Sequence, residues 1–145
     1  NAFLPIFRIN KVCGTIKFLG DFEYYIDKQK DTNKLIGLSD SYHHHKNSIR
    51  LGWRWSKLMS KIEIMTILYS DSKRTIQHFC FIEDQAKEYE FEIKILKDYY
   101  VVIFNKQNVF IERTSSWCLP SVVLKPYFGG TTKAPKEFKF DIDLK

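Results

Sequence analysis

Several features that would define a class of protein are scarce or missing in this sequence. No apolar run approaches the roughly 20 residues that cross a bilayer, so the sequence predicts no membrane span. The first residues lack the basic stretch and apolar core of a signal peptide. The three cysteines, Cys13, Cys80 and Cys118, are too few for a disulfide framework. We expect them to be small, buried, unpaired side chains.

The short motifs of common enzymes and metal proteins are also missing. The chain has no CxxC, HExxH or GxSxG motif and no phosphate-binding glycine loop, so we expect no cofactor and no metal. Glu88, Glu90 and Glu92 could lie about 6–7 Å apart on one strand face, a spacing that glycoside hydrolysis can use. The same alternation is typical of any solvated strand face, so a protein without catalytic activity is favoured.

Aromatic residues and basic charge are abundant instead. The 145 residues include 12 Phe, 8 Tyr and 3 Trp, which favours strands over helices. The length predicts a single domain over residues 1–145. The formal charge of +6 is dispersed along the chain and no nucleic-acid-binding signature accompanies it, so we expect no nucleic-acid partner.

Alternation with period two predicts many strands. It is clearest in Lys87–Leu96 and in Phe138–Leu144, where apolar and charged residues take turns. Short turn-like clusters separate the segments, and Asp27–Ser41 is predicted to be a long loop. Further strands are expected at Thr15–Leu19, Phe22–Ile26, Ser48–Trp55, Lys61–Tyr69, Arg74–Ile82, Tyr99–Asn105, Val109–Arg113 and Val122–Tyr127.

These strands predict an all-β fold. Lys61–Tyr69 and Tyr99–Phe104 are apolar on both faces, so they are expected to be central strands covered on both sides. That arrangement favours an antiparallel two-sheet sandwich over a single exposed sheet.

The segment Asn47–Trp55 carries the first candidate binding residues. Its odd positions are apolar, whereas Arg50 and Arg54 project from the other face with Gly52 between them. Guanidinium groups hold carboxylates, sulfates and hydroxyls in fixed directions, and a glycine lets a ligand approach the backbone. The alternative is that both arginines pair across strands with Glu63, Glu90 or Glu92.

Other candidates are histidine and aromatic residues. His43 and His45 share a face of an extended chain, and with His78 or Asp40 they could meet a metal ion. A polar edge of a ligand groove is the favoured interpretation of this histidine segment. Tyr127 and Phe128 are expected at the rim of the sandwich, where an aromatic ring could stack on a sugar or close the end of the core.

Four segments resemble a known group of proteins. NKLIGLSDSYHHHKNSIRLGWRW, KIEIMTILYSDSKR, KEYEFEIKI and KPYFGGTTKAPKEFKFDI resemble small bacterial β-sandwich proteins related to concanavalin A-like lectins and glucanases. The resemblance covers about residues 15–144 and implies a concanavalin A-like jelly roll. Such relatives are secreted or outer-surface proteins, and the wider superfamily binds or cleaves polysaccharides on a curved sheet. The resemblance therefore implies a secreted, periplasmic or cell-surface protein with Arg50, Arg54, Trp53 or Trp55, and Tyr127 near a ligand groove.

The expected function is non-catalytic binding of a polysaccharide or glycan on a concave sheet face. The catalytic ExDxE strand motif of related glucanases is absent, since KEYEFEIK reads E-x-E-x-E. A lyase or hydrolase using His78, Tyr127 and a strand carboxylate is one alternative. A structural module whose edge strand meets a protein partner is the other. The expected ligand-binding residues are Arg50, Arg54, His43, His45, Trp55 and Tyr127.

Overall fold

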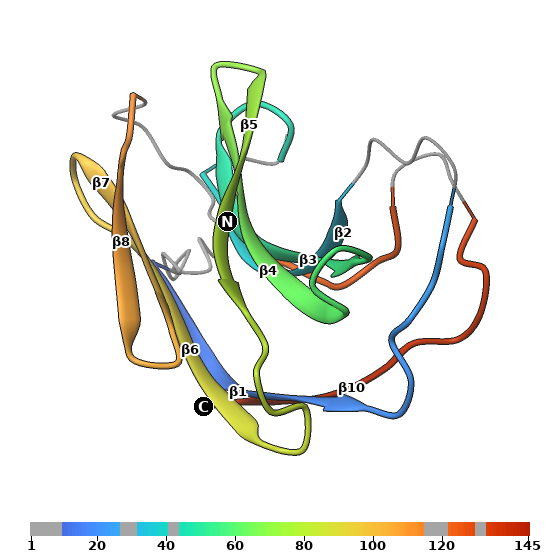
Figure 1. Ribbon diagram of the computed structural model, residues 1–145. Helices are drawn as coiled ribbons and strands as arrows, with labels where there is room; N and C mark the ends of the chain where they lie inside the picture. Colours follow the sequence, from blue (N-terminus) through green and yellow to red (C-terminus); the bar gives the residue numbers. More distant parts are fainter. Residues whose placement is uncertain (1–9, 27–31, 41–43, 115–121, 130–132) are drawn as a thin grey trace, which may run out of the picture.

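The computed structural model describes residues 10–26, 32–40, 44–114, 122–129 and 133–145. Two five-stranded antiparallel sheets pack face to face (Figure 1). The predicted all-β sandwich is therefore confirmed, whereas its concanavalin A-like kinship stays a prediction. The described residues contain no helix with the length and apolar character needed to cross a bilayer.

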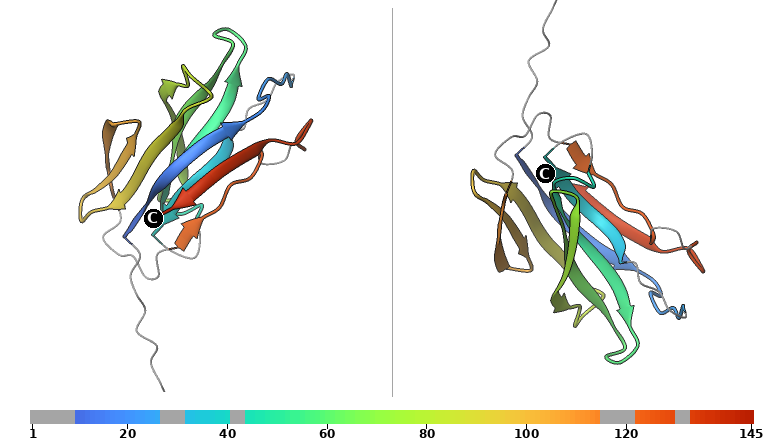
Figure 2. Two further views of the ribbon diagram at one scale, coloured as in Figure 1. Left: turned by 90° about the horizontal axis from the view of Figure 1, so that it is seen from below. Right: turned by 90° about the horizontal axis from the view of Figure 1, so that it is seen from above.

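The two sheets differ in strand order. Sheet A has the order β10-β1-β6-β7-β8, and sheet B has the order β5-β4-β3-β2-β9. The strands of sheet A are β1 (Lys11–Leu19), β6 (Glu88–Ile95), β7 (Tyr99–Phe104), β8 (Gln107–Glu112) and β10 (Lys139–Leu144). The strands of sheet B are β2 (Asn33–Ser39), β3 (Ser48–Ser56), β4 (Lys61–Ser70), β5 (Lys73–Phe81) and β9 (Val122–Leu124). Figure 2 shows them as two layers.

Tight turns join neighbouring strands where the sequence predicts them. Asp71 and Ser72 connect β4 to β5 with φ of 49° and 67°, and Asn105 and Lys106 connect β7 to β8 with φ of 48° and 67°. Two consecutive residues with positive φ match the right-handed twist of the strands on either side.

Two predictions about strands are wrong. The sequence predicts a loop at 27–41, but β2 occupies Asn33–Ser39 and all seven of its residues are buried. The polar residues at its start and a bulge between Lys34 and Gly37 hide the alternation that would have revealed it. Conversely, Phe22–Ile26 is not a strand. Its buried and exposed residues alternate as in a strand, but the segment does not pair with any described strand.

An aromatic cluster fills one end of the core. Trp53 on β3 is 1% exposed and meets Phe22, Phe138 and Phe140 with ring centroids 5.0–5.8 Å apart. The rings meet mostly edge to face, the arrangement that favours contact between the positive edge and the negative face. This cluster joins β3 to β10 and supports the segment that follows β9.

Candidate functional site

The strand β3 divides its residues between the core and the outer face of sheet B, the face turned away from sheet A. Ile49, Leu51 and Trp53 are at most 1% exposed and point into the core. Arg50 and Arg54 alternate with them and lie on the outer face, as the sequence predicts. The two arginines therefore share one surface, and the rest of that surface decides what they can bind.

The outer faces of the two sheets carry opposite charge. In sheet B the strand residues on this face include one carboxylate, Glu63, and the basic residues Lys34, Arg50, Arg54, Lys61 and Arg74. In sheet A the basic residues are Lys11, Lys17, Lys94 and Lys139, and the acidic residues are Glu88, Glu90, Glu92, Glu112, Asp141 and Asp143. Among the described strands, the basic charge of the chain thus gathers on sheet B and favours an anionic partner there.

The segment after β9 holds Tyr127 at the edge of this basic face. Lys34 and Tyr127 exchange two backbone hydrogen bonds of 2.8 and 3.1 Å. The backbone N–H of Gly129 donates to Oδ1 of buried Asn33 at 2.8 Å, and Gly129 has a φ of 53°. These bonds fix the backbone on both sides of Tyr127, while 42% of the residue stays exposed. An exposed ring on a fixed backbone can stack on a ligand at little entropic cost.

Two buried cations lie against the ring of Tyr127. The Cζ of Arg50 is 5.2 Å and the Nζ of Lys34 is 5.1 Å from the ring centroid. Both residues are at most 5% exposed. Such distances allow cation–π attraction on the order of 1 kcal/mol for each pair.

Arg50 has no carboxylate partner among the described residues. Its Nη2 donates to the backbone oxygen of Lys125 at 2.6 Å, and its buried Nε has no hydrogen-bond partner. Burial lowers the pKa of Arg50 to about 10, which the nearby phenols of Tyr127 and Tyr69 oppose only in part. A buried cation without an opposite charge costs stability, so it is a position where an anion would be stabilised.

Glycine makes room for Arg50 on the adjacent strand. A Cβ at Gly37 would lie 2.2 Å from the Cβ of Arg50 and 2.5 Å from the backbone oxygen of Ile49. The sequence analysis expected Gly52 to leave its backbone open to a ligand. The structure differs, because a Cβ at Gly52 would lie 2.7 Å from Ile67 Cδ1. The side chain of Ile67 therefore already covers Gly52, and a ligand has less access to that backbone than the sequence implies.

Arg54 has a different partner from Arg50. Its Nε donates to Glu63 Oε1 at 2.6 Å, which is the cross-strand pair that the sequence offered as an alternative. The other oxygen of Glu63 lies 2.6 Å from Nδ1 of His78, so one buried carboxylate is shared by two basic side chains. Arg54 remains half exposed, but its guanidinium is held on the β4 side of β3.

The histidine segment lies beside the basic face. His45 is exposed and its ring lies 5.1 Å from the ring of Tyr69, while His43 lies outside the described residues. Burial lowers the pKa of the neighbouring His44, and the charges of His45 and Arg50 lower it further. Within the described part of the chain, no three His, Cys, Asp or Glu side chains are placed to hold a metal ion.

Trp55 and His78 do not lie beside Tyr127 on the outer face of sheet B. Trp55 is paired with Ile62 and lies on the core side of β3, opposite to the two arginines. The strand register runs from His78 through Met65, Gly52 and Lys34 to Tyr127. Four interstrand steps of about 4.8 Å separate His78 from Tyr127 by roughly 19 Å, too far for both to act on one glycosidic bond.

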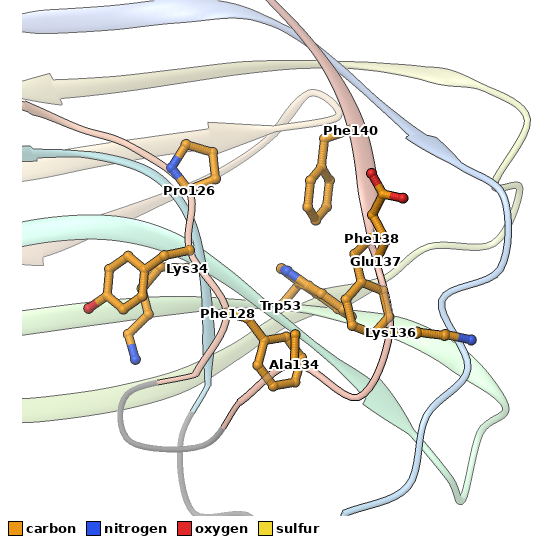
Figure 3. A pocket seen from close by; sticks show the side chains of 10 residues that line it. Lys34, Trp53, Pro126, Phe128, Ala134, Lys136, Glu137, Phe138 and Phe140 are labelled. Atoms are coloured by element: carbon orange, nitrogen blue, oxygen red, sulfur yellow. The ribbon is translucent and has the colours of Figure 1, made fainter.

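A pocket of about 280 Å³ adjoins Tyr127 at the open edge of the sandwich (Figure 3). It lies between β10 and the segment after β9, and Trp53 forms part of its wall. The sequence analysis did not indicate this pocket, because it joins short stretches from distant parts of the chain. The lining residues are Lys34, Trp53, Pro126, Tyr127, Phe128, Ala134, Lys136, Glu137, Phe138 and Phe140.

The fold and these features define a two-sheet β-sandwich with a basic outer face and an aromatic-lined pocket at its edge. No model of a known protein family matches the chain, and a comparison with curated proteins gives no match either. The function is therefore inferred from the geometry of the face and the pocket.

Proposed function

We propose that this protein binds an anionic polysaccharide, without cleaving it, on the outer face of sheet B. The observation that carries the proposal is Arg50, a buried cation with no carboxylate partner among the described residues, packed against the exposed ring of Tyr127. Lys34 adds a second cation at the same ring. A sulfate or carboxylate group of a sugar would supply the missing negative charge.

The combination of charge and aromatic surface favours a glycan over a free inorganic anion. Tyr127 offers a ring face to the C–H face of a sugar, while Arg50 and Lys34 offer donors to its charged substituent. Tyr127 is the well-exposed part of this site, so a ligand buries little surface there and the affinity per site is expected to be modest.

The proposal includes the kinship and the location that the sequence resemblance implies. A concanavalin A-like sandwich that binds a polysaccharide would act in the secreted, periplasmic or cell-surface setting where such polymers occur. Of the expected ligand residues, Arg50 and Tyr127 are the ones the proposal uses most directly. His45 extends the same basic region through Tyr69, whereas Arg54 is assigned to Glu63.

The test is a binding panel with acidic and neutral probes. Heparin-derived and alginate-derived hexasaccharides supply sulfate and carboxylate groups, and cellohexaose is the neutral control. We expect the acidic probes to bind, the affinity to fall with added salt, and cellohexaose to bind at least about tenfold more weakly. The product mixture is examined for new reducing ends and for unsaturated uronates.

Each other outcome contradicts a definite part of the proposal. If cellohexaose bound as tightly as the acidic probes, Arg50 and Lys34 would not recognise an acidic group of the ligand. Cleavage of either probe would show that the protein is an enzyme and would contradict non-catalytic binding. Tighter binding of single-stranded DNA than of both acidic hexasaccharides would identify a nucleic-acid-binding face instead.

A further inference from the structure

The pocket beside Tyr127 has the indole of Trp53 in its wall. Trp53 is 1% exposed, and its indole nitrogen faces the open middle of the pocket (Figure 3). Among the described residues Trp53 makes no side-chain hydrogen bond, so its N–H is available to donate into the pocket. A ligand with an oxygen acceptor would satisfy it.

The walls of the pocket are aromatic. Phe128 and Phe138 stack with their planes 1° apart and their centroids 5.4 Å apart. Phe140 lies 5.8 Å from Trp53 and continues the apolar lining along β10. Figure 3 shows these rings arranged around the pocket. Rings in this arrangement offer flat apolar surfaces to the C–H groups of a ring-shaped ligand.

The rim of the pocket is polar. Glu137 is exposed and makes no ion pair with any described residue. Lys34 donates to the backbone oxygen of Gly129 at 3.0 Å, and Lys136 donates to Asp21 at 2.7 Å. A purely apolar ligand would leave the Trp53 N–H unpaired and would desolvate this rim without replacement. A sugar ring, which has apolar C–H faces and oxygen atoms around its edge, suits both the walls and the rim.

We propose that this pocket is the subsite for one pyranose ring of the same anionic glycan. The inference rests on the proposed function, since Lys34 and Tyr127 belong both to the pocket and to the cationic site. A glycan whose acidic group meets Arg50 would place an adjoining sugar at the pocket. The volume of about 280 Å³ exceeds that of a cavity of about 150 Å³, which holds a benzene ring.

Filling the pocket tests the inference without removing a core residue. Ala134 lines the pocket and is partly exposed, so Ala134→Phe would occupy its space. Ala86 is exposed, lies in the turn between β5 and β6, and does not line the pocket, so Ala86→Phe is the matched control. For the heparin and alginate hexasaccharides we expect Ala134→Phe to weaken binding by about tenfold and Ala86→Phe to leave it within about twofold.

The indole N–H of Trp53 gives a direct signal of occupancy. The variants Trp55→Phe and Trp117→Phe would assign the indole resonances of the three tryptophans in ¹H–¹⁵N spectra. We expect the Trp53 indole resonance to shift during titration with an acidic hexasaccharide, and to stop shifting in Ala134→Phe.

The outcomes separate this inference from the proposed function. A shift of the Tyr127 amide without a shift of the Trp53 indole, together with full affinity of Ala134→Phe, would overturn the subsite and leave glycan binding in place. An absence of any shift or heat with both acidic hexasaccharides would overturn both.

Discussion

The guanidinium carbon of Arg50 lies 5.2 Å from the centroid of the Tyr127 ring. Arg54, on the same strand and the same face, instead donates to Glu63 on the neighbouring strand at 2.6 Å. Two arginines on the same face of one strand therefore have different environments: Arg54 pairs with a carboxylate, whereas Arg50 is buried with no carboxylate partner among the described residues. This difference makes Arg50 the position at which a ligand can supply negative charge.

The stability of the chain should depend less on Arg50 than its burial suggests. Arg50→Met keeps most of the side-chain volume and removes a buried charge that has no carboxylate partner in the described part of the chain. We expect the free energy of unfolding to change by less than about 1.5 kcal/mol in either direction, measured by urea unfolding. A loss above about 3 kcal/mol would show that Arg50 holds the fold together and is not reserved for a ligand.

Gly37 should be intolerant of any side chain. Gly37→Ala would place a Cβ 2.2 Å from the Cβ of Arg50 and 2.5 Å from the backbone oxygen of Ile49, so we expect a loss of at least about 3 kcal/mol in urea unfolding. Gly20→Ala is the comparison, because that glycine has open space around it and a φ of 83°. We expect Gly20→Ala to cost only about 1 kcal/mol, and equal effects of the two substitutions would contradict the packing around Gly37.

The folded protein should lose stability at alkaline pH through Tyr100. Burial raises the pKa of Tyr100 above its usual value of 10.0, and its hydrogen bond to Asp40 raises it further. Above pH 10 the unfolded chain releases the Tyr100 proton while the folded chain keeps it. Stability should therefore fall as pH rises beyond 10, by about 1.4 kcal/mol per pH unit for this group, in urea unfolding at stepwise pH.

Tyr100→Phe provides the control for that pH dependence. The variant loses the hydrogen bond to Asp40, so its stability at neutral pH is expected to be lower. The informative quantity is the slope above pH 10, which should be shallower than that of the wild type by about 1.4 kcal/mol per pH unit. Parallel slopes for the two proteins would show that Tyr100 ionises normally in the folded state.

Much of the fold could be predicted from the sequence, because apolar and polar residues alternate in strands that have one buried face and one solvent-exposed face. β6 follows this rule, with Tyr89, Phe91 and Ile93 buried and charged residues between them. β2 does not, because it is buried throughout and contains Asn33 and Lys34. Asn33 and Lys34 form hydrogen bonds with the segment after β9 and so fix the position of Tyr127. The strand that the sequence pattern did not reveal, β2, is therefore the strand that positions Tyr127.

The candidate site could be predicted only in part for the same reason. Strand periodicity places Arg50 and Arg54 on one face, but it does not say which neighbour each guanidinium reaches. The partners depend on pairing between β3, β4 and β2, and on the space that Gly37 leaves. The pocket depends on contacts between β10 and the segment after β9, which are far from β3 in sequence.

The most direct measurement is isothermal titration calorimetry of the wild type, Arg50→Met and Arg54→Met with heparin-derived and alginate-derived hexasaccharides. The two variants remove the same charge from the same face of β3. We expect Arg50→Met to weaken the binding of the acidic probes by about tenfold or more, and Arg54→Met to change it by less than about twofold. Equal losses in the two variants would show attraction to net charge alone, and full affinity in Arg50→Met would contradict the assignment of Arg50 as the anion-binding residue.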